Sequence, residues 1–282
     1  MSARTEALAE RAAAIAHRRA IAPEQVKLLN LASNEAKRRY FAKLERERNR
    51  HIARWEKKLR SRFRAEMRSV KAEIAAGAAA FELSSAPWLM LLMTLYGSIS
   101  RAFGAQAARQ LAEADKSVRA RRKAAADLWW SLIERYVAEN VGTKVLGILA
   151  TTRESIKATL LEGMREGEGV HLLSERIERL YLDDIIPHRS EVIARTEVIQ
   201  MANFASQAAA GASGLKLERE WYATADARTR LDHRAANGQR QPYGKPYSVG
   251  GSKLMYPGDS SLGAGADQVV NCRCAELFHT VR

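Results

Sequence analysis

The sequence predicts a mainly α-helical protein with a small C-terminal β-containing element, an α+β class in which long basic N-terminal helices precede a compact C-terminal domain. The first reason is the run from Glu24 to about Val70, which contains no proline or glycine and is rich in strong helix formers. The second is a change of pattern after Gly214, where turn-forming residues and short alternating segments replace helical spacing. With 282 residues, 46% of them hydrophobic, the chain can bury a core.

The N-terminal quarter of the chain carries most of its net positive charge. Apolar residues recur there three or four positions apart, which predicts one apolar stripe on a long helix, with lysines and arginines around the remainder. Residues 1–71 hold 20 Lys and Arg against 8 Asp and Glu, whereas residues 124–282 hold 19 against 20. A solvated face is the plain interpretation, but this excess is more than solubility requires. It favours non-specific contact with a polyanion such as DNA, because phosphate contacts carry no base information. The candidate contact residues are Lys37, Arg38, Arg39, Arg46, Arg50, Lys57, Lys58, Arg121, Arg122 and Lys123.

An uncharged segment follows the basic run. Residues 72–100 are rich in alanine and then apolar, which is typical of a helical hairpin or of a surface for another subunit, so self-association through residues 74–100 is expected. The uncharged part, residues 83–100, has the minimum length of a membrane span, but Pro87, Gly97 and several hydroxyl residues dilute it. We therefore expect a buried helix and no membrane span. The first residues also lack the pattern of a signal peptide.

A composition shift at Asn140–Thr143 predicts the boundary between a basic helical region, residues 1–139, and a second domain, residues 140–282. In the second domain, helices are expected over 151–210. They would begin at the capping-box spacing of Thr151 and Glu154, stop at Gly167–Gly169 and break again at Pro187.

The last part of the chain, residues 217–282, is predicted to be rich in short strands and turns. Leu217 to Ala223 alternates like a strand and includes Trp221. Turns are expected at Asn237–Gly238, Gly250–Gly251 and Tyr256–Asp259, because these residues are the strongest turn formers.

Polar residues that carry chemistry concentrate in the same part of the chain. Asp226 is suited to cap a short helix running to about Ala236, which would put Asp226 and His233 on one face with Arg230 and Asn237. Both cysteines of the chain stand in Cys272-Arg-Cys274, where an extended backbone would place the two sulfurs on one side. A disulfide across so short a loop is badly strained, so a reducing compartment is expected.

These residues admit more than one interpretation. A carboxylate, an imidazole and two thiols form a tetrahedral zinc set, with Asp226, His233, Cys272 and Cys274 as ligands. The cysteines could equally be small apolar residues buried beneath a turn. A third hypothesis makes one cysteine a nucleophile, with His233 as its base.

Taken together, the order and spacing of these C-terminal motifs resemble the phage Mu F-like head morphogenesis family of minor head proteins. The resemblance covers about residues 140–282. The residues in these motifs are Arg195, Glu197, Trp221, Asp226, Arg228, Arg230, His233, Asn237, Gly238, Tyr256, Pro257, Asp259, Asn271, Cys272, Arg273 and Cys274.

The resemblance implies a minor capsid protein of a tailed phage or prophage, present in few copies and incorporated near the portal during head assembly. It implies a role in DNA packaging or ejection, with the portal protein, the major capsid protein or both as partners. The protein would belong to the virion, and to the host cytoplasm during assembly. No enzymatic activity is implied.

Two functions from different classes follow. In the first, the protein is structural: the polar cluster holds the C-terminal domain together, and the basic helices contact packaged double-stranded DNA or an acidic portal surface. Arg195 and Glu197 would then serve as structural ion-pairing residues. In the second, the protein is a metal-dependent nuclease or hydrolase that uses Asp226 with His233 and the two cysteines.

Overall fold

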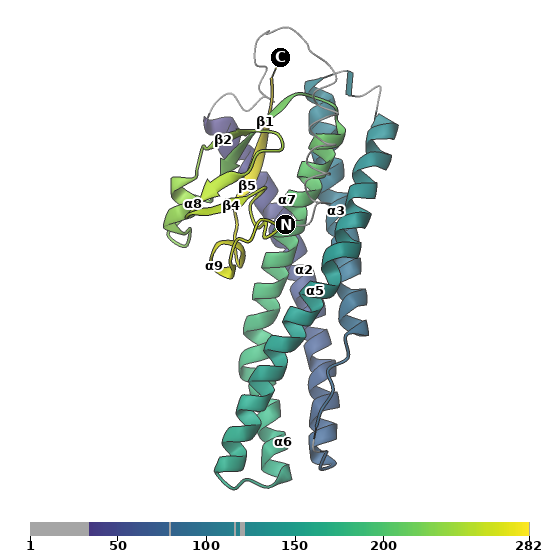
Figure 1. Ribbon diagram of the computed structural model, residues 1–282, viewed down its shortest axis with the longest axis vertical. Helices are drawn as coiled ribbons and strands as arrows, with labels where there is room; N and C mark the ends of the chain where they lie inside the picture. The colour runs from purple at the N-terminus through teal and green to yellow at the C-terminus, as the bar shows by residue number, and fades with distance from the viewer. Residues whose placement is uncertain (1–33, 79, 116, 119–121, 282) are drawn as a thin grey trace. The chain divides into compact units, whose positions relative to one another are not determined.

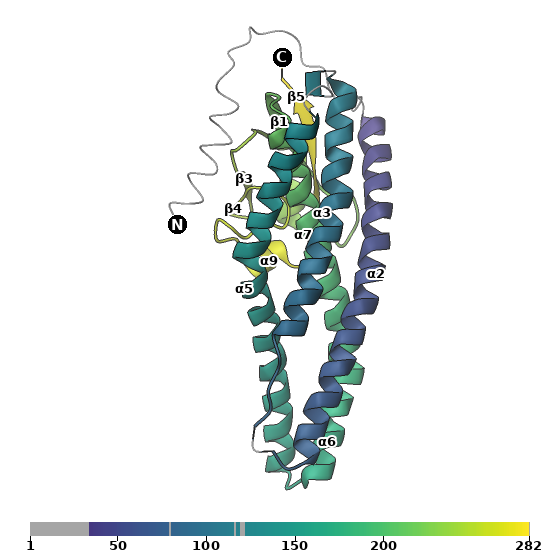
Figure 2. The same ribbon diagram turned by 90° about the vertical axis from the view of Figure 1, so that its right-hand side faces the viewer.

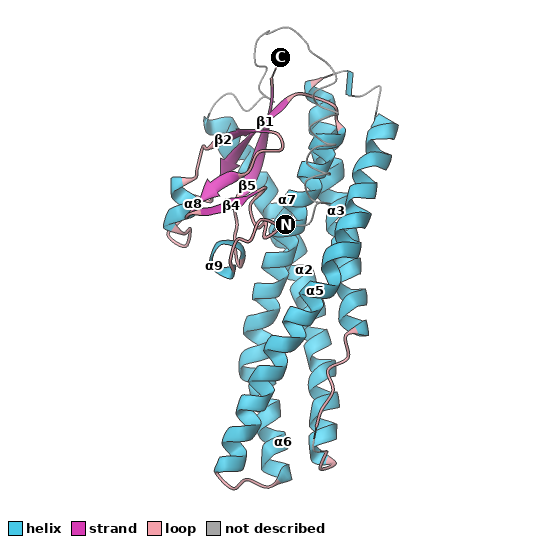
Figure 3. Ribbon diagram, in the orientation of Figure 1, coloured by secondary structure: helices cyan, strands magenta, loops and turns pink. Residues whose placement is uncertain are grey.

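The computed structural model describes residues 34–78, 80–115, 117–118 and 122–281, and these confirm the predicted fold class (Figure 3). Four long α-helices dominate, and the strands all come from the C-terminal part of the chain (Figure 1 and, turned by 90°, Figure 2). The helices are α2 (Asn34–Ala75), α3 (Ala86–Ala114), α5 (Arg122–Arg165) and α7 (Ser190–Ala212).

The described residues fall into two compact units. The first, here called the C-terminal unit, comprises residues 34–49, 97–134 and 196–281. The second, the helical unit, comprises residues 50–96 and 135–195. Each of the four long helices contributes residues to both units.

The helical unit buries aromatic and branched side chains of α2 and α3. Phe63 of α2 and Trp88 of α3 are fully buried, with their ring centroids 4.7 Å apart. Glu66 lies beside them and accepts hydrogen bonds from the Trp88 indole at 2.7 Å and from the Tyr181 hydroxyl at 3.0 Å. Burial raises the pKa of Glu66, so these donors partly offset the cost of its charge.

The uncharged segment is a buried helix, as predicted. Leu92, Leu95 and Ile99 of α3 are all fully buried. Among the described residues, no helix combines the length and the apolar content that crossing a bilayer would require.

The predicted helix start at Thr151 is wrong, because α5 runs without a break from Arg122 to Arg165. The hydroxyls of Thr151 and Thr152 donate to the carbonyl oxygens of Gly147 and Ile148, at 2.8 and 2.9 Å. Bonds to the preceding turn satisfy both hydroxyls inside the helix, so they are not needed as caps. The predicted domain boundary at 140–143 falls inside the same helix.

Gly167, with φ of 75°, follows α5 and confirms the predicted stop. The predicted break at Pro187 is wrong. The chain continues as α6 (Val170–Arg179) and then as a π-helix, η1 (Leu180–Arg189), which contains Pro187 and leads directly into α7. Proline removes one backbone donor and crowds the preceding turn of an α-helix. The wider π turn tolerates it, and the buried side chains of Ile185 and Ile186 hold the segment in place.

The C-terminal unit contains a three-stranded antiparallel sheet in the order β2-β1-β5 (Figure 1). The central strand β1 (Leu217–Tyr222) pairs with β2 (Arg240–Pro242) on one side and with β5 (Ala275–Thr280) on the other. All six residues of β5 are buried. The sheet therefore brings the segment after Cys274 against the predicted strand around Trp221.

A separate hairpin joins β3 (Tyr247–Val249) to β4 (Ser252–Leu254). Its two-residue loop is Gly250–Gly251, with φ values of 54° and 80°. Two successive positive φ values match the twist of a tight hairpin and are readily adopted by glycine. The turn signal in the sequence is thereby confirmed.

Candidate metal centre and basic helix face

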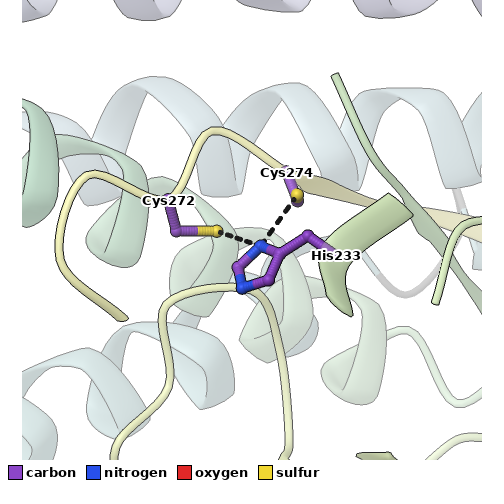
Figure 4. Close-up of side chains that lie close together, drawn as sticks. All are labelled: His233, Cys272 and Cys274. Atoms are coloured by element: carbon purple, nitrogen blue, oxygen red, sulfur yellow. Dashed lines mark hydrogen bonds between the residues drawn. The ribbon is translucent and has the colours of Figure 1, made fainter. Parts of the chain in front are cut away.

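Three buried side chains converge in the C-terminal unit: His233, Cys272 and Cys274 (Figure 4). Nδ1 of His233 lies 3.7 Å from Sγ of Cys272 and 3.4 Å from Sγ of Cys274. The three potential ligand atoms all lie within 4.8 Å of one another. Each residue is 3% exposed or less.

The short helix α8 (Leu231–Ala235) supplies His233. The predicted helix start at Asp226 is wrong, since α8 begins only at Leu231 and its N-cap is Arg230. The Asp226 carboxylate instead accepts hydrogen bonds from the backbone of Arg228 at 3.0 Å and from the Thr229 hydroxyl at 3.2 Å. Such local bonding closes a turn and competes with helix formation.

Asp226 is not part of the three-residue group. Its carboxylate is held by both terminal nitrogens of Arg273, at 2.5 and 2.6 Å. Hydrogen bonds from Arg273 hold the pKa of Asp226 well below its usual range. The alternation of the Cys272–Cys274 segment thus sends both sulfurs toward His233 and Arg273 toward Asp226. Three of the four predicted ligands come together, and the fourth is engaged elsewhere.

The turn before the cysteines is fixed by polar contacts. Asn271 has φ of 58°, a left-handed conformation that asparagine tolerates better than most residues, and its N–H donates to the Thr196 hydroxyl at 3.1 Å. One residue earlier, the carbonyl oxygen of Val270 accepts a hydrogen bond from Arg230 at 2.6 Å. These bonds set the direction in which Cys272 enters the core.

The imidazole of His233 is itself oriented by Gln268 of α9 (Ala266–Val269), whose Oε1 lies 3.1 Å from Nε2 of His233. The amide nitrogen of Gln268 donates to the carboxylates of Asp232 and Asp267, both at 3.1 Å. The ring of Trp221 packs edge-on against the imidazole, with centroids 5.4 Å apart.

The two thiols differ in acidity. A hydrogen bond from Cys274 lowers the pKa of Cys272 well below that of a free cysteine. The pKa of Cys274 is raised, because it donates that hydrogen bond and is buried.

A buried arginine, Arg48, holds the backbone at Cys274. It was not among the site residues predicted from the sequence. Arg48 of α2 is 3% exposed and donates to the carbonyl oxygen of Cys274 at 3.1 Å and to the side-chain oxygen of Asn203. Asn203 in turn donates to the carbonyl oxygens of Cys274, at 3.1 Å, and of Pro257, at 2.8 Å. Burial lowers the pKa of Arg48 to about 10. The available signal was that Arg48 stands in the apolar stripe, four residues after Leu44 and four before Ile52.

The other motif residues tie the turns of the C-terminal unit together. Asn237 accepts the backbone N–H of Ala223 at 2.9 Å, and Gly238, with φ of 81°, donates to the carbonyl oxygen of Trp221 at 2.8 Å. Asp259 is 1% exposed and accepts the backbone N–H of Met255 at 2.8 Å.

The remaining motif positions lie in turns and on α7. Tyr256 packs against Phe204 with ring centroids 5.7 Å apart. Arg195 forms an ion pair with Glu191 one turn earlier, and Glu197 is buried. Arg228 is an exposed side chain 3.9 Å from the carboxylate of Asp226.

One predicted DNA contact has another partner. Lys37 lies 2.7 and 2.8 Å from the two carboxylate oxygens of Glu220 on β1, which also meets Nε2 of His279 at 2.7 Å and Arg240 at 3.4 Å. Burial opposes the charge of Glu220, but hydrogen bonds from His279 and Lys37 outweigh it and lower the pKa to about 2. Lys37 thus pairs with β1 and is not available for DNA contact.

The Glu220 carboxylate should make the free energy of unfolding depend on pH in the acidic range. A carboxyl whose pKa is about 2 when folded and about 4.5 when unfolded adds stability above pH 4.5, and that contribution is lost as the pH falls toward 2. The Glu220→Gln variant should therefore lose stability less steeply than the wild type across this window, by at most about 1.4 kcal/mol per pH unit. Urea unfolding at a series of pH values measures the slope. Glu218→Gln, whose Arg240 contact is 3.8 Å and half exposed, should keep the wild-type slope; equal slopes for both variants would refute the assignment.

The exposed face of α2 carries a stripe of positive charge, here called the basic stripe. Its nine positions follow one another at intervals of three or four residues, so they share one side of the helix. All nine are exposed and eight are lysine or arginine, with Ser61 as the exception. The eight basic residues are Arg39, Lys43, Arg46, Arg50, Arg54, Lys57, Arg64 and Arg68.

Four of the predicted DNA-contact residues, Arg39, Arg46, Arg50 and Lys57, belong to this stripe, and Arg38 is exposed beside it. Lys58 lies instead over the ring of Trp55, 4.1 Å from its centroid. Arg121 and the side chains of Arg122 and Lys123 lie outside the residues that the structure describes. Lys43, Arg54, Arg64 and Arg68 were missed, although their spacing was visible in the sequence.

Comparison with known proteins gives one match. Residues 154–277 match the family model described as Phage Mu protein F like protein. No curated protein and no solved structure matches the chain significantly. The matched residues include His233, both cysteines, the strands β1 and β2 and the first half of β5. Over residues 154–277, the chain is therefore similar to the Phage Mu protein F-like family, and this match supports a phage head-related protein.

Proposed function

We propose that this protein is a minor head protein of a tailed phage or prophage that acts in head morphogenesis near the portal and contacts packaged double-stranded DNA. It would assemble in the host cytoplasm, with the portal protein or the major capsid protein as its neighbour, and remain in the virion. The family match over residues 154–277 supports the head assignment. The basic stripe on α2 is the single observation that carries the DNA contact.

The stripe has the properties of a phosphate-binding surface. Helix α2 holds 15 Lys and Arg against 6 Glu, yet none of the nine stripe positions is acidic. Of the eight basic residues, only Arg39 has an ion pair among the described residues, with Glu35 at 2.7 Å. Between Arg50 and Arg68 the helix rises by about 27 Å, a distance over which B-DNA presents on the order of 16 phosphate charges. Because the contacts would be to phosphates, binding would not depend on base sequence.

Replacing three stripe residues should weaken DNA binding in a salt-dependent way. We expect the full-length Arg54→Gln/Lys57→Gln/Arg64→Gln variant to bind a duplex of random sequence less tightly than the wild type. If each residue neutralises one phosphate, the slope of log K against log[salt] should become shallower by roughly 2–3. Fluorescence anisotropy at several salt concentrations measures both quantities.

The matched control removes the same charge from the same unit. Arg135, Arg153 and Arg165 are exposed residues of α5 that do not belong to the stripe. Their triple glutamine variant has the same net charge as the stripe variant. If both variants lose the same affinity, net charge alone explains binding and the stripe has no special role. If the wild type does not bind duplex DNA at low salt, the DNA contact is disproved, while the head assignment does not depend on this result.

A further inference from the structure

The distances among His233, Cys272 and Cys274 fit the ligand set of a metal ion. In a tetrahedral zinc site, Zn–S distances of about 2.3 Å and Zn–N distances of about 2.0–2.1 Å place the nitrogen about 3.6 Å from each sulfur. The corresponding separations are 3.7 and 3.4 Å (Figure 4). We propose that this group binds one Zn²⁺ ion through Nδ1 of His233 and the thiolates of both cysteines.

The hydrogen bonds of Gln268 leave the correct nitrogen of His233 free for a metal. Because the amide nitrogen of Gln268 faces the carboxylates of Asp232 and Asp267, its oxygen must face His233. That oxygen can only accept, so Nε2 of His233 carries the proton and donates it. In the neutral imidazole Nδ1 then has a lone pair, which is directed at the two sulfurs. A histidine that ligates a metal usually donates its other ring N–H to such an acceptor.

A metal also accounts for the approach of both sulfurs to one ring nitrogen. A single Nδ1 lone pair can accept a full hydrogen bond from only one thiol, yet both sulfurs approach it at similar distances. A zinc ion would be bound by all three atoms at once. Three protein ligands leave a fourth position, which water or a donor from another molecule completes.

The proposed ion would link parts of the chain that are far apart in sequence. His233 lies on α8, while the cysteines directly precede β5, about 40 residues later. The ion would therefore fasten α8 to the sheet. This role is structural and does not depend on DNA contact by α2.

Metal analysis of the full-length protein tests the proposal. The protein is expressed in zinc-supplemented medium, purified without chelators and freed of any histidine tag, because such a tag would bind metal itself. Inductively coupled plasma mass spectrometry should find about one zinc per chain. Since Cys272 and Cys274 are the only cysteines of the chain, a sulfur-to-cobalt charge-transfer band after exchange with Co²⁺ can come from this site alone.

Variants separate the site from adventitious binding. Cys272→Ser and His233→Asn should each lose most of the bound zinc, whereas His171→Asn, a change at an exposed histidine of the helical unit, should keep it. Gln268→Leu should still bind one ion, but with affinity lower by about 10- to 100-fold, because only the orientation of the imidazole is lost.

Two results would overturn the proposal. One is a wild-type protein that retains no zinc after equilibration with excess Zn²⁺ and dialysis, together with no cobalt–sulfur band. The other is zinc content that is the same in the wild type and in Cys272→Ser. If the cysteine variant fails to fold, the zinc content and cobalt spectrum of the wild type still decide the question.

Discussion

Arg219→Met is expected to lower the free energy of unfolding by about 3–5 kcal/mol, the largest effect that we predict for a single substitution. Arg219 and Glu276 lie on adjacent strands, are 0% and 1% exposed at their side chains, and meet at 2.7 Å. Arg219 also donates to the carbonyl oxygens of Met255 and Lys245 and stacks over Tyr247 at 5.0 Å. Removing the guanidinium leaves a buried carboxyl and two carbonyl groups without this donor.

The double variant Arg219→Met/Glu276→Leu distinguishes a buried charge from lost packing. Burial raises the pKa of Glu276 to about 7 even beside Arg219, which shows how costly its charge is at this position. Replacing both partners by apolar groups removes that cost, so the double variant should be clearly more stable than Arg219→Met. Denaturant unfolding of the three proteins at one pH measures the difference. A double variant as unstable as Arg219→Met would show that lost packing and the lost donors to Met255 and Lys245, and not the charge of Glu276, dominate.

Arg48→Met is expected to cost about 2–4 kcal/mol, because charged hydrogen bonds in a buried setting contribute about 1.5–3 kcal/mol each. The substitution removes the donor that joins α2 to Asn203 and to the carbonyl oxygen of Cys274. Asn203 would lose a partner for its own oxygen while remaining buried. The loss should appear as a lower denaturant midpoint with little change in the dependence on denaturant concentration.

Arg46→Met is the matched control, with the same substitution two residues earlier on the same helix. Arg46 is an exposed member of the basic stripe, so its replacement should change stability by less than about 0.5 kcal/mol. A comparable loss in both variants would mean that the buried contacts of Arg48 contribute little. The two arginines therefore separate the residue that supports the site from those available to a polyanion.

Much of the local structure could be predicted from the sequence because it depends on neighbouring residues. Helix-forming composition with apolar spacing predicted α2, and alternation around Trp221 predicted β1. Gly250–Gly251 predicted the turn between β3 and β4, because two positive φ values in succession strongly favour glycine. The family resemblance likewise follows from the order of motifs along the chain.

The wrong predictions concern residues that are typical of a helix end but that can also take another structural role. Thr151 was expected to start a helix, but its hydroxyl is satisfied within α5. Pro187 was expected to end a helix, but a π-helical segment contains it. Asp226 was expected to cap α8 and to ligate zinc, and it instead closes a turn and holds Arg273.

By itself, the sequence determined the fold class and the concentration of positive charge near the N-terminus, because composition and spacing carry both. It also determined the resemblance to the Mu F-like family, which the order of the C-terminal motifs carries. Only the tertiary structure decided which basic side chains are exposed to a partner and which of the predicted metal ligands lie close together. Lys37, Arg48 and Arg46 are all basic residues of one helix, so the sequence does not distinguish them. In the structure, Lys37 pairs with Glu220, Arg48 is buried and donates to the carbonyl oxygen of Cys274, and Arg46 is exposed. The physical reason is that burial and pairing depend on contacts between residues more than 150 positions apart, which spacing along one helix does not encode.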